Sequence, residues 1–123
     1  MKNDIYTKRD IEALVNCFYR KVNADELLAP LFERVNWALH LPMMYQFWEN
    51  TIFFTGSYLG NPMATHILLH KKTPLNHQHF TRWLQLFNTT VDELFEGPKA
   101  LLAKQRANSI AVVMQTKILQ PGE

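Results

Sequence analysis

Two histidines stand four residues apart in the segment THILLH, where His66 and His70 flank three aliphatic residues. Residues four apart lie on one face of a helix, so both imidazoles could reach a single metal ion. The zinc-peptidase pattern, however, needs glutamate directly after the first histidine, and Ile67 stands there instead. His77 and His79 could supply further ligands, but they belong to another segment without acidic neighbours. The sequence therefore disfavours a zinc site.

A flat apolar cofactor with a polar centre is the second candidate. Tyr19 and Trp83 stand inside apolar helical repeats, and a buried Tyr hydroxyl or Trp N–H needs a hydrogen-bond partner or a ligand. Haem would pack against the aromatic surface that eight Phe, three Trp and four Tyr provide, and a neutral imidazole can bind its iron. The competing interpretation is that both polar tips and all histidines face solvent. Composition and spacing alone favour that interpretation, because aromatic stripes at helical spacing more often form core.

Composition and charge indicate one soluble globular domain over residues 1–123, with 47% hydrophobic and 20% charged residues. The net charge is +2 and the basic residues are scattered, so we expect no nucleic-acid or membrane partner. The single cysteine excludes an intrachain disulfide, and phosphate-binding glycine loops and the Gly-x-Ser-x-Gly motif are absent. No signal-peptide or membrane-spanning pattern is present, so we expect a cytoplasmic protein.

Apolar residues recur at helical spacing, and no segment alternates as a strand would, so the expected class is all-α. Thr7 and Asp10 resemble a capping pattern before a first helix of about four turns. The segment LLAPLF then predicts a short helix and a turn. From Asn36 to about Phe54 a second long helix follows, in which Pro42 must cause a kink or mark the true beginning.

Three further helices are expected in the second half of the chain. Asn61-Pro62 predicts the start of a short helix that contains THILLH and ends before Pro74. Asn76 can open the next helix, which Gly97-Pro98 stops, and the last helix begins at Pro98.

The order and spacing of several segments resemble the truncated haemoglobins, and specifically their third group. The resemblance runs from about Ile11 to Ala111 and rests on FYRKV (18–22), LLAPLF (27–32), W-x-x-HL (37–41), FW (47–48), YLGNPMATH (58–66), HFTRWLQLF (79–87) and TVDELFEG (90–97). It implies a shortened globin whose helices stack two over two around one b-type haem per chain, held without covalent attachment.

By motif position, the resemblance implies that His66 is the proximal ligand of a five-coordinate iron. Tyr19, His40 and Trp83 match the distal residues that face a diatomic ligand, and His40 could either donate to this ligand or act as a gate. Further haem contacts are expected from Phe32, Met44, Phe47, Trp48, Met63 and Phe80, with Tyr58 or His70 near the propionates.

Donors from Tyr19 and Trp83 in a dry pocket would hold a partly negative diatomic ligand tightly and release it slowly. Slow release suits reaction better than transport, which predicts nitric oxide detoxification or peroxide reduction as a dioxygenase or peroxidase-like activity. An external reductase is then required, because 123 residues leave no room for a flavin domain. The alternatives are an oxygen store or sensor without turnover, or a haem-free helical adaptor. We expect a monomer.

Overall fold

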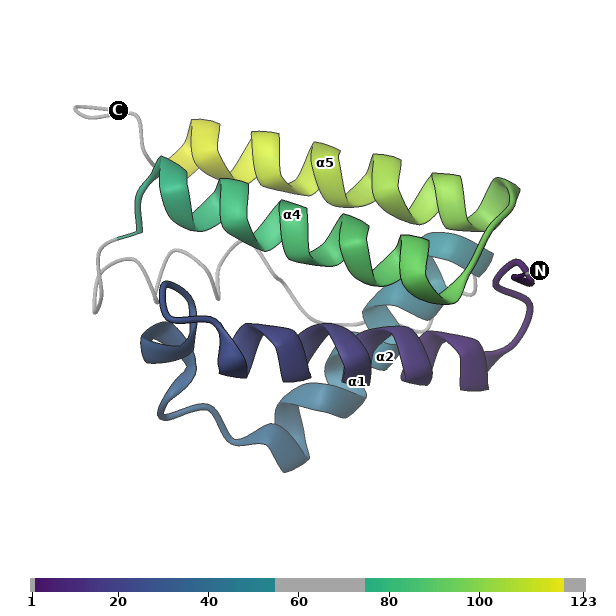
Figure 1. The fold of residues 1–123 in the computed structure, drawn as a ribbon, viewed down its shortest axis with the longest axis horizontal. Helices are drawn as coiled ribbons and strands as arrows, with labels where there is room; N and C mark the ends of the chain where they lie inside the picture. Colours follow the sequence, from purple (N-terminus) through teal and green to yellow (C-terminus); the bar gives the residue numbers. More distant parts are fainter. Residues whose placement is uncertain (1, 55–74, 119–123) are drawn as a thin grey trace.

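The computed structural model describes residues 2–54 and 75–118. In these ranges the chain forms α1 (Lys8–Ala24), the 3-10 helix η1 (Ala29–Phe32), α2 (Trp37–Phe53), α4 (His77–Leu94) and α5 (Pro98–Ile118), without a strand. Helices α4 and α5 run antiparallel and side by side, and α1 and α2 cross each other beneath them (Figure 1). The predicted all-helical class and two-over-two stacking are therefore confirmed.

Two helices begin with reciprocal capping boxes. At α1 the Thr7 hydroxyl accepts a hydrogen bond from the N–H of Asp10 at 3.2 Å, and the Asp10 carboxylate accepts one from the N–H of Thr7 at 3.0 Å. At α4 the Asn76 side chain accepts from the N–H of His79, while His79 Nδ1 accepts from the N–H of Asn76. Both helix starts were predicted, but the capping role of His79 was not.

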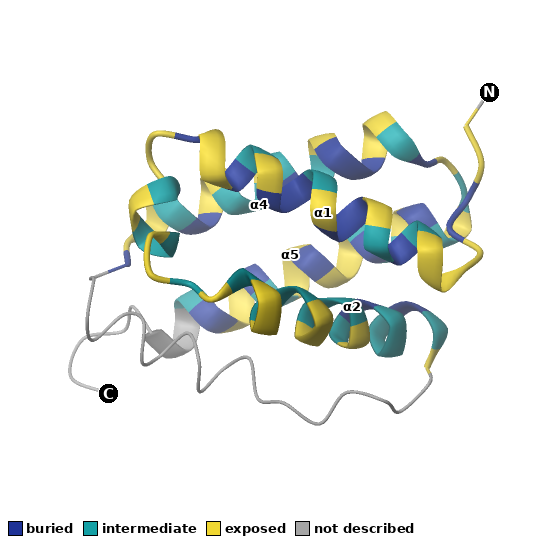
Figure 2. Ribbon diagram, turned by 90° about the horizontal axis from the view of Figure 1, so that it is seen from below, coloured by how far each residue is buried: buried dark blue, intermediate teal, exposed yellow. Residues whose placement is uncertain are grey.

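Helix α2 begins at Trp37, with Asn36 as its N-cap, so Pro42 lies inside the helix and does not mark its beginning. Proline has no N–H, so the usual bond to the carbonyl of Ala38 cannot form beside His40. Only Trp48 and Ile52 of α2 are buried, and one side of the helix faces solvent (Figure 2).

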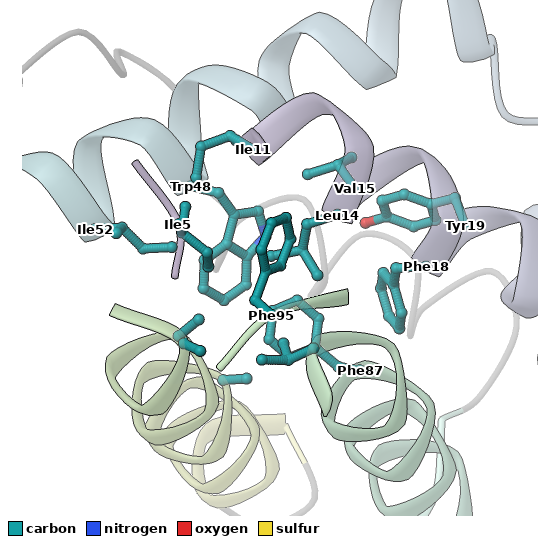
Figure 3. Packing of buried hydrophobic residues seen from close by; sticks show 14 of the residues in the cluster. Ile5, Ile11, Leu14, Val15, Phe18, Tyr19, Trp48, Ile52, Phe87 and Phe95 are labelled. Atoms are coloured by element: carbon teal, nitrogen blue, oxygen red, sulfur yellow. The ribbon is translucent and has the colours of Figure 1, made fainter. Parts of the chain in front are cut away.

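The core is built mainly from aromatic and aliphatic side chains on α1, α2 and α4. Phe87 stacks on Trp48 with ring centroids 4.7 Å apart and meets the edge of Phe18 at 5.2 Å (Figure 3). Helix α5 contributes mostly alanines to its buried face, namely Ala100, Ala103, Ala107 and Ala111. Small side chains let the backbone of α5 approach its neighbours closely. Helices α4 and α5 together form one of the two helical layers (Figure 1).

The N-terminal segment fixes the start of α5. The buried carboxylate of Asp4 accepts hydrogen bonds from the N–H groups of Lys99 at 2.9 Å and Ala100 at 2.8 Å. Gly97 has a φ of 141°, and a Cβ at this position would lie 2.6 Å from Cγ of Asp4. Glycine is therefore required both by the backbone conformation and by the close approach of Asp4.

Replacing Asp4 with alanine is expected to lower the free energy of unfolding by about 1–3 kcal/mol, because two N–H groups at a helix start lose their acceptor. Burial would raise the pKa of Asp4, but the hydrogen bonds from backbone N–H groups outweigh it and hold the pKa below its ordinary value. The stabilisation is thus present above about pH 4 and is lost as the pH falls through the folded-state pKa.

Urea unfolding of the wild type and Asp4→Ala at neutral and acidic pH measures this effect. The difference between the two should shrink as the pH falls below about 4. Asp92→Ala is the control, because this carboxylate is 61% exposed and pairs with Lys104 at the surface. An equal loss of unfolding free energy in Asp92→Ala, or no loss in Asp4→Ala, would contradict the capping role of Asp4.

Candidate functional site

An apolar pocket opens between α1, η1, α2, α4 and α5, with a volume of about 720 Å³ including its mouth. All five elements contribute to the lining, which consists of Tyr19, Leu28, Leu31, Phe32, Met44, Phe47, Trp48, Leu75, His79, Phe80, Trp83, Ile110, Ala111 and Met114. Such a lining fits a flat, largely apolar group.

The structure brings together seven of the residues that the sequence suggested for one site. These are Tyr19, Phe32, Met44, Phe47, Trp48, Phe80 and Trp83. They come from four separate elements, so their meeting in one pocket is a result of the tertiary fold. The predicted residues Tyr58, Met63, His66 and His70 lie outside the described ranges.

Tyr19 is buried at the pocket, with 8% of its surface exposed. Its ring packs against those of Phe18 at 4.9 Å, Trp37 at 5.1 Å and Phe32 at 6.0 Å. Burial raises the pKa of Tyr19 well above its ordinary value, since the phenolate would lack solvation. The hydroxyl therefore keeps its proton in neutral solution and can act as a hydrogen-bond donor.

His40 lies beside Tyr19, and the described lining of the pocket does not include it. The His40 ring stands 5.4 Å from the ring of Tyr19 and 5.4 Å from that of Trp37, edge to face with both, and its Nε2 atom is buried. Trp37 in turn stacks on Phe32 at 5.9 Å. The predicted distal histidine thus contacts the predicted distal tyrosine, and Trp37 supports both rings.

Trp83 lines the pocket from α4 and is half-buried. Its indole stacks on Phe87 at 5.9 Å with an interplanar angle of 13°, and it meets Phe18 edge to face at 5.7 Å. Phe18 therefore contacts both Tyr19 and Trp83, so one core ring supports the two donor side chains. The indole N–H is a donor only, whatever the pH.

Seven lining residues were not predicted as site residues. They are Leu28, Leu31, Leu75, His79, Ile110, Ala111 and Met114. Ile110 and Met114 carried the helical periodicity of α5, which assigns them to a buried face without saying what that face contacts. The dual position of His79, at the cap of α4 and at the pocket, has no local sequence signal beyond its spacing from Asn76.

No group of three or more His, Cys, Asp or Glu side chains is arranged to hold a metal ion in residues 2–54 and 75–118. In that same part of the chain, every helix is too short or too polar to cross a bilayer.

A two-over-two helical fold that encloses an apolar pocket, with a tyrosine and a tryptophan in its wall, defines a protein of the globin class. The chain belongs to the bacterial-like globin family, whose model matches residues 3–117. Proteins of the truncated globin family bind haem and diatomic gases.

A known relative and a solved crystal structure place this chain more closely. It is 27% identical over 128 residues to the group 3 truncated hemoglobin ctb of Campylobacter jejuni, covering 99% of this chain and 98% of that protein. The crystal structure of the group III truncated hemoglobin from Campylobacter jejuni superposes with a TM-score of 0.87 at 27% identity, covering 100% and 99% of the two chains. The resemblance to the third group is therefore confirmed.

A more distant solved structure shares the fold. The protein THB1 of Chlamydomonas reinhardtii superposes with a TM-score of 0.71 at 24% identity, covering 87% of this chain and 88% of that one. At this identity the likeness bears on the fold alone.

Proposed function

We propose that this protein holds one b-type haem in the pocket, with His66 as the proximal ligand of a five-coordinate iron, and reacts a diatomic ligand there in nitric oxide detoxification or peroxide reduction. One observation carries the proposal: Tyr19 and Trp83, whose side chains carry hydrogen-bond donors, line an otherwise largely apolar pocket. A small number of polar groups in such a lining typically orients the bound ligand.

The pocket residues fit the macrocycle. Phe47, Trp48 and Met44 from α2 and Phe80 from α4 offer broad apolar surfaces, which suit a flat ring. Haem supplies the iron that binds diatomic gases and exchanges electrons with them. The protein supplies position, hydrogen bonds and the exclusion of water.

The two donors would set how strongly the ligand is held. The Tyr19 hydroxyl is protonated and buried, and hydrogen bonds are strengthened where the local dielectric is low. Trp83 is held in place by the stacked ring of Phe87, so its donor is positioned before the ligand arrives. A tightly held ligand leaves slowly, which favours reaction over delivery.

The redox reaction needs electrons, which would come from an external reductase in the cytoplasm. The protein would work as a monomer.

Repeated nitric oxide consumption tests the redox role. Conversion of oxygen and nitric oxide to nitrate would take one electron from the reduced, haem-loaded protein, and a reductant would have to return it before the next cycle. We expect the haem-loaded protein, with oxygen, NADPH and a flavin reductase, to consume many equivalents of nitric oxide. Trp83→Phe should lose oxygen about tenfold faster, because one donor is removed, and should complete fewer cycles.

The result that would contradict the redox role is consumption of a single equivalent of nitric oxide per haem, after which the iron stays oxidised although NADPH and an active reductase are present. Oxygen storage or sensing, in which the donors only set affinity, would then explain the same pocket. The reductase without the protein is the control.

A further inference from the structure

One ion pair joins the two elements that carry the donors. The Nε atom of Arg82 on α4 donates to Oδ1 of Asp25 at 2.6 Å, and Asp25 caps the C-terminal end of α1. The other carboxylate oxygen of Asp25 accepts from the N–H groups of Leu27 at 3.2 Å and Leu28 at 3.1 Å. Both oxygens are therefore engaged, one by α4 and one by the turn after α1.

The pair lies next to pocket residues on both sides. Arg82 directly precedes Trp83, and Leu28, which the Asp25 carboxylate orients, lines the pocket and is 2% exposed. Asp25 ends the helix that holds Tyr19. The distance between α4 and the turn after α1 is thus fixed at the level of the pocket by a polar contact as well as by packing.

The two side chains of this pair differ in burial. The Asp25 side chain is 6% exposed and that of Arg82 is 46% exposed. Burial would raise the pKa of Asp25, but the hydrogen bond from Arg82 and those from the two N–H groups hold the pKa below its ordinary value. Loss of Arg82 would leave a buried carboxylate with backbone donors alone, which is unfavourable, and the turn after α1 would no longer be joined to α4 by this bond.

We infer that Asp25 and Arg82 are positioning residues, which fix Trp83 relative to the turn after α1 and so set how strongly the pocket holds a diatomic ligand. This inference rests on the proposed function. It concerns the geometry of the donors and leaves the identity of the iron ligand unaffected.

A second ion pair provides a matched control. Lys21 and Glu93 also join α1 to α4, at 2.8 Å, but their side chains are 28% and 50% exposed and neither residue lines the pocket. Exposed pairs contribute little to stability. A substitution there removes the same kind of bond between the same two helices without reaching the donors.

The experiment compares Arg82→Gln, Arg82→Lys and Glu93→Gln in the haem-loaded, carbon monoxide-bound protein by infrared spectroscopy, together with the oxygen dissociation rate. A donor near the ligand lowers the C–O stretching frequency, so Arg82→Gln should shift it toward the value of Trp83→Phe. Oxygen dissociation should become about five- to tenfold faster in Arg82→Gln, as expected for a coupling between contacting residues. Arg82→Lys should restore part of both effects, and Glu93→Gln should match the wild type.

The inference is overturned if Arg82→Gln lowers the thermal midpoint of unfolding but keeps the wild-type C–O stretching frequency and oxygen dissociation rate. The pair would then contribute to stability without affecting the bound ligand. Asp25→Asn, which keeps an acceptor for the N–H groups of Leu27 and Leu28, replaces Arg82→Gln if the latter does not fold. Failure of the proposed haem site is distinguishable, because the wild type itself would then show no haem absorption, and failure of the redox role would leave the stretching frequency and the dissociation rate of the wild type unchanged.

Discussion

Replacing Tyr19 with phenylalanine is expected to raise the oxygen dissociation rate of the haem-loaded protein by about 10- to 100-fold. The substitution removes the hydroxyl and keeps the ring, so the contacts with Phe18, Trp37 and His40 remain. A hydrogen bond to a charged acceptor contributes about 1.5–3 kcal/mol, and each 1.4 kcal/mol corresponds to a factor of ten. Displacement of oxygen by excess carbon monoxide in a stopped-flow instrument measures the rate.

Tyr45→Phe is the matched control for this experiment. Tyr45 is half-buried and its hydroxyl donates to Asn16, but the described pocket lining does not include it. Loss of the Tyr45 hydroxyl should leave the oxygen dissociation rate unchanged. The wild-type rate should also stay constant through about pH 10, where an ordinary tyrosine ionises, because burial raises the pKa of Tyr19. An equal rate in wild type and Tyr19→Phe would refute the donor role.

Replacing His66 with alanine is expected to weaken haem retention by at least about 100-fold, because even partners of a metal ligand contribute about 10- to 100-fold to metal affinity. This expectation rests on the GNPMATH motif, since His66 lies outside the described residues. Transfer of haem to an excess of a haem-scavenging apoprotein, followed by absorbance, measures retention.

His70→Ala is the control, because it removes the other histidine of THILLH. It should retain haem within a small factor of the wild type, as expected of a residue that at most lies near a propionate. Equal haem loss in the two variants would mean that the histidines act together. Retention by His66→Ala would place the iron ligand elsewhere.

The helix boundaries could be predicted from the sequence because capping is a local interaction. Thr7 with Asp10, and Asn76 at the start of α4, begin helices where their spacing indicated. Pro42 was harder to interpret, since proline fits the first turn of a helix as well as a kink. In the structure it lies inside α2, and its missing N–H leaves one carbonyl without the usual partner.

The pocket could be predicted only in part. Motif positions identified Tyr19 and Trp83, and the structure brings both to one cavity from different helices. The composition alone had favoured exposed polar tips, yet Tyr19 is buried. Ala111 and Met114 were missed because periodicity shows which face of a helix is buried but not which neighbour covers it.

The link between Asp25 and Arg82 was also missed, for a different reason. Its partners stand 57 positions apart, and nothing local marks either residue, since both types are common on protein surfaces. Only the fold shows that the carboxylate is buried beside the pocket. Contacts of this range depend on how the helices stack, which the spacing of residues along one helix does not determine.

Titration of the haem-free protein with haemin tests the central claim most directly. We expect an intense haem absorption band that saturates at one haem per chain, with quenching of the fluorescence of Trp48 and Trp83, which line the pocket. Ala111→Trp, which places a large side chain in the same cavity, should weaken both signals. Absorption no different from that of free haemin, or an equal titration of wild type and Ala111→Trp, would contradict the assignment of this pocket to haem.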